Sequence, residues 1–165
     1  MDTGDELARQ LALHDWDYII AGDGSGTTWD KTIGYGSILY CRQDGKHKKF
    51  FGGMSHGTNN IAEMLAVCVP LLFLDGMSMN WKNWSPNVYI LSDSMYVVQT
   101  GNGDWTKRTN HLLWSVMDTA RSKMNLIFLH VNRMLLPANV FGDHIGNAVR
   151  WQLQEIANQI EIPNT

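Results

Sequence analysis

The chain has 165 residues, of which 44% are hydrophobic and 18% charged, as in an ordinary globular domain and unlike a disordered or fibrous chain. No apolar run approaches the ~20 residues of a spanning helix and no signal peptide opens the chain, so we expect one domain without a membrane partner. The two cysteines, Cys41 and Cys68, have no metal-ligand spacing and predict reduced thiols in a cytoplasmic (intracellular) protein without a zinc site.

The net charge of −3 is unevenly distributed. Residues 1–17 hold five acidic residues and one arginine, a charge of −4, so the rest of the chain carries +1. If four of its acids bind metal, as argued below, the remaining surface carries +5. This distribution permits a polyanionic partner without requiring one.

In chain order, residues 1–17 are predicted to form an N-terminal extension and residues 18–162 one domain. Apolar runs between turn residues predict strands at 18–22, 34–41, 48–55, 88–91 and 126–131. Helical spacing predicts helices at 59–74, with a kink at Pro70, and at 94–100, 110–123, capped by Thr109, and 139–160. This order predicts an α/β domain with a mixed sheet, in which a three-strand antiparallel meander is followed by strands joined through flanking helices.

The stretch YIIAGDGSGTT, residues 18–28, surrounds a single charge, Asp23, with glycines. A dinucleotide-binding loop needs a third glycine or alanine five residues after the first glycine, at the start of a helix. Counted from Gly22, that position is Thr27, and a turn and a strand follow it. We therefore interpret the glycines as a bare surface around Asp23 and not as a phosphate loop.

Four acidic residues occupy positions where an isolated charge is costly. Asp23 lies on the first apolar strand and Glu63 inside an apolar helix. Asp93 ends a buried strand and Asp143 lies near the start of the last helix. Alone, Asp93 is also explained as a helix cap, and Asp143 as a charge that complements a helix N-terminus. Together they would repel one another unless cations such as Mg²⁺ neutralise them, so they predict a divalent metal site.

Five segments stand out in order over about residues 18–160. They are DGSG at 23–26, GTNNIAEMLAV at 57–67, LSDSMYVV at 91–98, GNGDWTKRTNHLL at 101–113, and HVNR at 130–133 with Asn139, Asp143 and NA at 147–148. Together and in this order they resemble type 1 ribonuclease H. The closing pattern is most similar to the archaeal-like and plant-like branch, which lacks the basic handle helix. The resemblance implies a ribonuclease H-like fold with a five-stranded mixed sheet flanked by helices.

The resemblance also implies an endoribonuclease that hydrolyses the RNA strand of RNA–DNA hybrids and leaves 5′-phosphate and 3′-hydroxyl ends. Carboxylates would hold two Mg²⁺ ions, or Mn²⁺ as a substitute. Asp23 would bridge both ions, Glu63 and Asp93 would hold the leaving-group side, and Asp143 would complete the nucleophile side. Arg133, which is always protonated, would orient the scissile phosphate or help product leave.

The same resemblance suggests which residues touch the hybrid. Asn59 and Asn60 would reach the minor groove, where amides select sugar type and not sequence. Thr58 and His56 match positions near the DNA-strand phosphate, and Lys107 and Arg108 are further phosphate candidates. The full set of predicted substrate-binding residues is Gly24, Ser25, Thr58, Asn59, Asn60, Ser94, Trp105, Lys107 and Asn139, with Asn110 as a further contact. Asn59 is equally explained as a helix cap, and Trp105 as a core residue.

Two alternatives stay open. One is another nuclease of the same fold, such as a junction resolvase or a proofreading exonuclease, although the exonucleases need a glutamate where Ser25 stands. The other is a catalytically silent hybrid-binding or protein-interaction module, which has no reason to keep four mutually repelling carboxylates. No obligatory protein partner is evident, and we expect a monomer that binds RNA–DNA hybrid.

Overall fold

The computed structural model describes residues 14–26 and 31–131 of the chain. Within them lies one five-stranded sheet with the strand order β3-β2-β1-β4-β5. The first three strands pair antiparallel, whereas β1, β4 and β5 run parallel to one another. The strands are β1 (Tyr18–Gly26), β2 (Ile33–Cys41), β3 (His47–Met54), β4 (Asn87–Ser92) and β5 (Asn125–His130). The mixed sheet predicted from the sequence is thereby confirmed.

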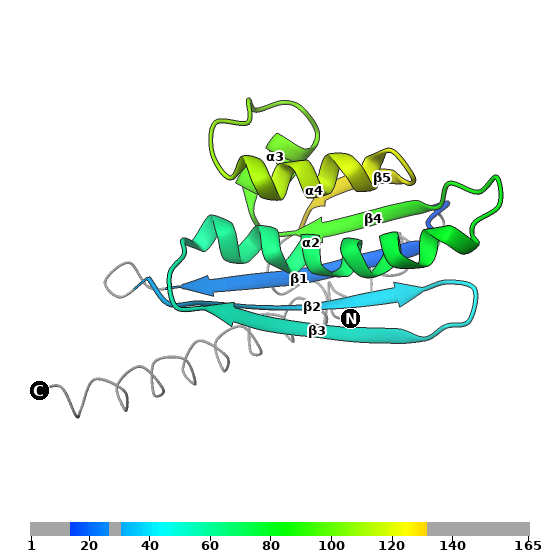
Figure 1. Ribbon diagram of the computed structural model, residues 1–165, viewed down its shortest axis with the longest axis horizontal. Coiled ribbons are helices and arrows are strands. Elements are labelled where there is room, and N and C mark those ends of the chain that lie inside the picture. Colours follow the sequence, from blue (N-terminus) through cyan, green and yellow to red (C-terminus); the bar gives the residue numbers. More distant parts are fainter. Residues whose placement is uncertain (1–13, 27–30, 132–165) are drawn as a thin grey trace, which may run out of the picture.

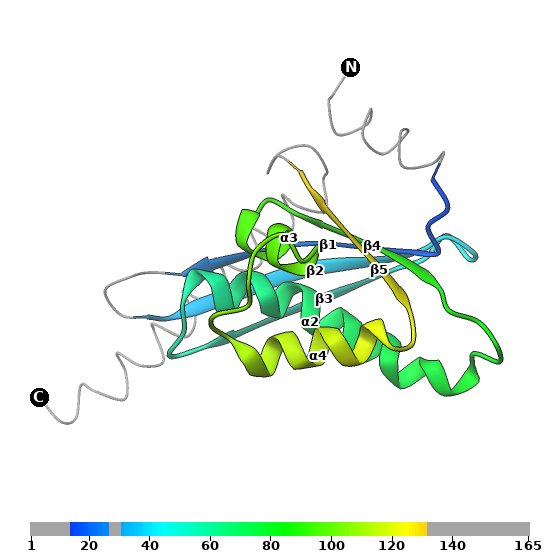
Figure 2. The ribbon, with the colours of Figure 1, turned by 90° about the horizontal axis from the view of Figure 1, so that it is seen from above.

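The helices form a second layer on the sheet. They are α2 (Asn59–Met77), followed by the 3₁₀ turn η1 (Ser78–Asn80), then α3 (Met95–Gly101) and α4 (His111–Arg121). Figures 1 and 2 show α2 and α4 side by side on one face of the sheet, with α2 over β1 and β2. The short helix α3 begins where β4 ends and packs against α2, β4 and β5.

Alternation along β1 divides the core between the two faces of the sheet. Tyr18 and Ile20 join the large cluster that β1 shares with the helices. Ile19 and Ala21 join a smaller cluster, and because successive side chains point to opposite faces, it lies on the other side. Asp23 has the same parity as Ile19 and Ala21, so its Cβ points away from the helical layer.

The pairing of β1 with β4 places two acidic residues next to each other, toward the carboxyl-terminal end of these two strands. Ala21 pairs with Leu91 in the parallel register. Asp23 and Asp93 each lie two residues beyond this pair. Because the two strands run in the same direction, their carboxyl ends meet, and the two aspartates are level with each other.

Most predicted element bounds differ from the structure by one to three residues. The largest difference in the sheet is β1, which continues through the glycines to Gly26 because Gly26 still pairs with Ile33 of β2. The helix predicted at 59–74 runs on to Met77, with Pro70 buried inside it. The predicted cap of α4 is wrong, because Asn110 and not Thr109 occupies the N-cap position. The helix predicted at 139–160 lies outside the described residues.

Helix α2 corrects the expectation that no apolar segment approaches the length of a membrane-spanning helix. The segment Asn59–Asn80 is long and apolar enough to cross a membrane by length and composition, with a mean hydropathy of 1.7 in its most apolar window. Its buried residues, among them Met64, Leu71 and Leu74, pack into the main core. A central core helix meets the same criterion, so this segment carries no argument for a membrane.

Residues 14–17 end the predicted N-terminal extension and are hydrogen-bonded to the sheet. The Asn87 backbone N–H donates to Asp17 Oδ2 at 2.7 Å, and the Asn87 side-chain amide donates to the Asp15 carbonyl oxygen at 2.7 Å. The Asp17 N–H in turn donates to the Asn87 carbonyl oxygen. These bonds join the entrance to β1 with the entrance to β4. The domain boundary at residue 17 stays a prediction.

Candidate metal centre and active site

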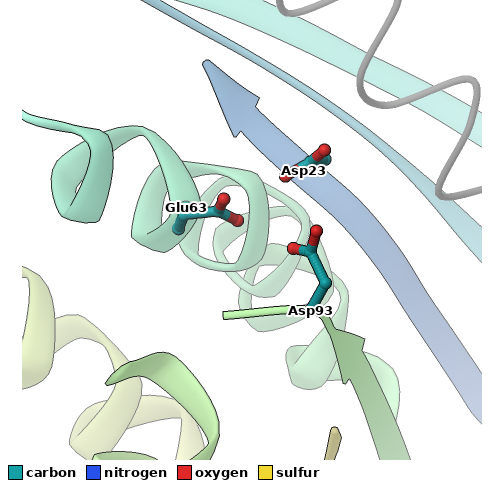
Figure 3. Close-up of side chains that lie close together, drawn as sticks. All are labelled: Asp23, Glu63 and Asp93. Carbon is teal, nitrogen blue, oxygen red and sulfur yellow. The ribbon is translucent and has the colours of Figure 1, made fainter. Parts of the chain in front are cut away.

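Three carboxylates from three separate elements meet at the carboxyl edge of β1 and β4 (Figure 3). Asp23 comes from β1, Glu63 from α2 and Asp93 from the bend directly after β4. One oxygen atom from each lies within 4.8 Å of the oxygens of the other two. Asp23 is 3% exposed, and its Oδ1 accepts the Gly24 N–H at 2.9 Å. The structure therefore brings together three of the four predicted ligands.

The absence of a side chain at Gly24 allows α2 to approach β1. A Cβ atom at Gly24 would lie 2.6 Å from the Ala62 Cβ and closer still to the Ala62 carbonyl carbon and the Glu63 nitrogen. The backbones of strand and helix are therefore in direct contact at this point. This contact places the Glu63 carboxylate beside Asp23, although the two Cβ atoms start from different layers of the fold.

We expect Gly24→Ala to destabilise the protein by about 1–3 kcal/mol, because the new methyl group overlaps backbone atoms of α2 that cannot rotate away. Chemical denaturation measures this change. Gly76→Ala is the matched control, since its added Cβ meets no atom within 4 Å and alanine favours the helix, so it should stabilise by about 0.5–1 kcal/mol. Equal stabilities of the two variants would contradict the close contact of α2 with β1 at Gly24.

The cluster is electrostatically unfavourable without a cation. Burial, together with the neighbouring charges of Asp23 and Asp93, raises the pKa of Glu63 from 4.5 to about 10. Among the described residues, the buried atoms Glu63 Oε2 and Asp93 Oδ1 have no hydrogen-bond partner. Buried carboxylate oxygens normally find a partner, so these two oxygens indicate that another ligand belongs there.

A divalent cation fits this site. Mg²⁺ binds carboxylate oxygens and is held through a few carboxylates, as the three converging side chains would provide. A bound cation would satisfy Glu63 Oε2 and Asp93 Oδ1 and would neutralise the mutual repulsion. The cluster contains no histidine or cysteine ligand that would favour zinc among the described residues.

The backbone around Asp93 is held by its neighbours. Ser92 Oγ accepts the Ser94 N–H at 3.1 Å, and Ser94 Oγ caps α3 by accepting the Val97 N–H at 3.2 Å. Since Ser94 caps α3, the alternative explanation of Asp93 as a helix cap is wrong. His130, at the end of β5, donates from Nε2 to the Asp93 carbonyl oxygen at 3.2 Å. His130 had no predicted role of its own, because only the β4–β5 pairing brings it to Asp93.

The predicted substrate residues at the start of α2 lie on an exposed surface next to the acidic cluster. Thr58, Asn59 and Asn60 are exposed. Thr58 Oγ1 accepts the Ile61 N–H at 3.2 Å, so Thr58 and not Asn59 caps the helix. The Asn59 side chain lies at Gly26, where an added Cβ would be 2.9 Å from its Oδ1. Both asparagine side chains are therefore available for a ligand that approaches the cluster along β1.

The segment after α3 carries the predicted substrate contacts Trp105 and Lys107 and the phosphate candidate Arg108. Trp105 is 48% exposed, which argues against a core role. The Lys107 ammonium group forms an ion pair with Asp118 of α4 at 3.0 Å, so its charge is already engaged. Arg108 is exposed and lines a cavity of about 420 Å³ with Trp105. Arg108 is the better placed of the two cations to meet a phosphate.

Three further predicted site residues, Arg133, Asn139 and Asp143, lie outside the described residues. Their roles stay predictions. Ser25 and Gly24 are described, at the end of β1 beside Asp23.

A mixed sheet of this strand order, with acidic residues from β1, from α2 and from the bend after β4 gathered together, defines a ribonuclease H-like α/β protein. The sequence matches the RNase H family over residues 15–145. The chain belongs to the RNase H family, and the prediction of a type 1 ribonuclease H is supported, whereas the branch within the family stays a prediction. No curated protein matches the sequence.

Solved structures share this fold at low sequence identity. The N-terminal RNase H domain of a Mycobacterium tuberculosis protein, solved as a fusion with maltose binding protein, is 19% identical with a TM-score of 0.67, over 85% of this chain and 97% of that one. LC11-RNase H1, from compost and in complex with RNA/DNA hybrid, is 20% identical with a TM-score of 0.67, over 82% and 97%. RNase H1 from the halophilic archaeon Halobacterium salinarum is 20% identical with a TM-score of 0.61, over 80% and 96%.

Proposed function

We propose that this protein is an endoribonuclease that hydrolyses the RNA strand of RNA–DNA hybrids and leaves 5′-phosphate and 3′-hydroxyl ends. The observation that carries the proposal is the convergence of Asp23, Glu63 and Asp93, with two of their buried oxygens unpartnered among the described residues. Such a cluster suits metal-assisted phosphodiester hydrolysis better than direct nucleotide binding. Its concentrated negative charge would repel a phosphate unless metal ions bound to the carboxylates. Membership of the RNase H family supports the same reaction.

The proposed cofactor is a pair of Mg²⁺ ions, with Mn²⁺ as a substitute. Asp23, Glu63 and Asp93 would hold them, and Asp143 would complete the ligand set. When bound, such ions activate a water molecule and stabilise the leaving oxygen. Asp23 is fixed for this task by its bond from the Gly24 N–H, and Asp93 by the bond from His130 to its carbonyl oxygen. Arg133 would orient the scissile phosphate or assist product release.

Selection of a hybrid is proposed to depend on the exposed amides next to the cluster. Asn59 and Asn60 project from the first turn of α2, beside the glycine-rich end of β1. Amides in a minor groove read acceptors that all base pairs share, and a neighbouring group can test for the 2′-hydroxyl. The complex of LC11-RNase H1 with RNA/DNA hybrid supports the same class of ligand.

A single assay with four labelled substrates tests the proposal. We expect cleavage of the RNA strand of a hybrid in Mg²⁺ or Mn²⁺, at least about a hundredfold faster than cleavage of double-stranded RNA, a DNA duplex or a four-way junction. Chelation of the metal should stop the reaction, and added Mg²⁺ should restore it. Preferential junction cleavage would instead favour a resolvase. Tight hybrid binding without cleavage in either metal would favour a silent binding module.

A further inference from the structure

The hydroxyl group of Tyr96 joins the active-site end of the fold to the segment that precedes α4. Tyr96 lies in the first turn of α3, directly after the Asp93–Ser94 bend. Its ring packs edge-on against Trp114 of α4, with the ring centroids 5.8 Å apart. Figure 1 shows the segment 102–110 as a loop that leaves α3 and returns to the start of α4. Tyr96 therefore lies at the base of this loop.

The hydroxyl oxygen of Tyr96 is saturated with hydrogen bonds. It accepts from Trp114 Nε1 at 3.0 Å and from Asn110 Nδ2 at 3.1 Å. Its own proton faces Thr109, whose carbonyl oxygen lies at 3.4 Å and whose Oγ1 lies at 3.3 Å. A tyrosine hydroxyl has one proton and two lone pairs, so this set uses its full capacity. Three residues from two elements thus converge on one atom.

One of these bonds holds an unfavourable backbone conformation. Asn110 is left-handed, with φ 58° and ψ 38°, and occupies the N-cap position of α4 without making a side-chain cap. Asparagine adopts this conformation at a lower cost than other residues that carry a side chain, and its surroundings keep it there. Here the Asn110 side-chain amide donates to the Tyr96 hydroxyl, and it accepts no hydrogen bond from the first N–H groups of the helix. The conformation of Asn110 sets the direction in which the loop enters α4.

The loop held in this way carries several exposed side chains beside Tyr96. Asp104, Trp105, Thr106 and Arg108 of the loop line the cavity of about 420 Å³ together with Tyr96 and Thr100 of α3. The first half of the loop is anchored to α3 by the Asp104 and Trp105 N–H groups, which both donate to the Gln99 carbonyl oxygen. Its second half is anchored by the Lys107–Asp118 ion pair and by the bonds to Tyr96. The ion pair is solvent-exposed, whereas the bonds from Asn110 and Trp114 to Tyr96 are partly buried.

We propose that Tyr96 is a positioning residue, whose hydroxyl holds the loop 102–110 in the orientation that binds the hybrid. This proposal rests on the proposed function, since it assumes a nucleic acid ligand on this side of the acidic cluster. Tyr96 does not touch the three carboxylates and takes no part in the chemical step. Loss of its hydroxyl should weaken substrate binding and leave the metal site intact.

Tyr96→Phe tests this role, because it removes the hydroxyl and keeps the ring against Trp114. We expect the KM for an RNA–DNA hybrid to rise about five- to tenfold, because the loop loses one or two neutral hydrogen bonds. The kcat should change less than about twofold. Amide hydrogen exchange in residues 102–110 should become faster, and exchange in β1 and β4 should not. Tyr40→Phe is the matched control, a tyrosine on β2 whose ring contacts His47 far from this loop.

The possible outcomes separate the two proposals. A KM increase with faster exchange confined to the loop supports positioning by Tyr96. A lower melting temperature with an unchanged KM would mean that the hydroxyl only stabilises the fold, and would overturn the inference while the function stands. Wild-type protein that neither binds nor cleaves the hybrid would overturn the proposed function itself. A loss of kcat alone would also overturn the inference, since it would place Tyr96 in the chemical step.

Discussion

Replacement of Asp23 by asparagine is expected to lower hybrid cleavage by at least about a thousandfold, because a bound cation contributes several kcal/mol to the transition state and loses a central ligand. Asp23 is the most buried of the three clustered carboxylates. It lies level with Asp93, which follows the neighbouring strand β4, and the carboxylates of Glu63 and Asp93 both lie close to it. Asp93→Asn should have a similar effect. Steady-state rates on a labelled hybrid in Mg²⁺ measure the change.

The same substitution should leave the fold intact. Asparagine has nearly the same shape as aspartate and relieves repulsion in the metal-free cluster, so the melting temperature of Asp23→Asn should equal or exceed that of the wild type. Asp75→Asn is the matched control. Asp75 pairs with Lys123 at 2.7 Å near the far end of α2, and its loss should leave cleavage within about twofold. An Asp23→Asn protein that cleaves at the wild-type rate would exclude this cluster as the catalytic centre.

Glu63→Gln is expected to stabilise the metal-free protein while it abolishes cleavage. The buried Glu63 carboxyl has a pKa of about 10 in the folded protein and an ordinary value of 4.5. Near pH 7 the folded state must keep this group protonated or bury its charge, whereas the unfolded state ionises it freely. Glutamine avoids this cost, so we expect the free energy of unfolding to rise by about 2–3 kcal/mol at pH 7, or about 5–10 °C in melting temperature.

The sign of this effect predicts its pH dependence. A group whose pKa is raised on folding favours the folded state fully below its unfolded pKa, and this contribution is lost as pH rises from 4.5 toward about 10. The stability difference between Glu63→Gln and wild type should therefore vanish below about pH 4.5 and grow with pH. Thermal melts in a chelator across pH 4–9 measure it. A difference independent of pH would mean that burial of Glu63 is not the cause.

Addition of Mg²⁺ should reverse the order of the two proteins. A cation that binds only the folded state stabilises it in proportion to the logarithm of its concentration above Kd. Wild type, with Glu63, should gain stability from millimolar Mg²⁺, and Glu63→Gln should gain less. Equal gains in both proteins would place the cation elsewhere.

Much of the sheet was predictable from the sequence because each strand carries its own signal. Runs of apolar residues between turn residues located all five strands of the described chain, since burial on a sheet imposes this pattern locally. The acidic residues were also predictable. A carboxylate inside an apolar strand or helix is costly alone, so Asp23, Glu63 and Asp93 each signalled an unusual environment.

Features that depend on a distant partner were not predictable. Gly26 belongs to β1 because Ile33 pairs with it, although DGSG has the composition of a turn. Lys107 is engaged by Asp118 of α4, so its sequence neighbours gave no sign that its charge is used. The N-cap position of α4 is occupied by Asn110 and not by the predicted Thr109, and the Asn110 amide bonds to Tyr96 of another helix.

The metal centre separates these two kinds of information. The identities of its carboxylates and the order of the elements that carry them follow from the chain, because hydrophobic pattern and charge are local properties. The distance of at most 4.8 Å between their oxygens does not. It depends on the parallel register of β1 with β4 and on the contact of α2 with β1 at Gly24. Both are contacts between residues far apart in the chain, and they form only when the sheet and helix pack.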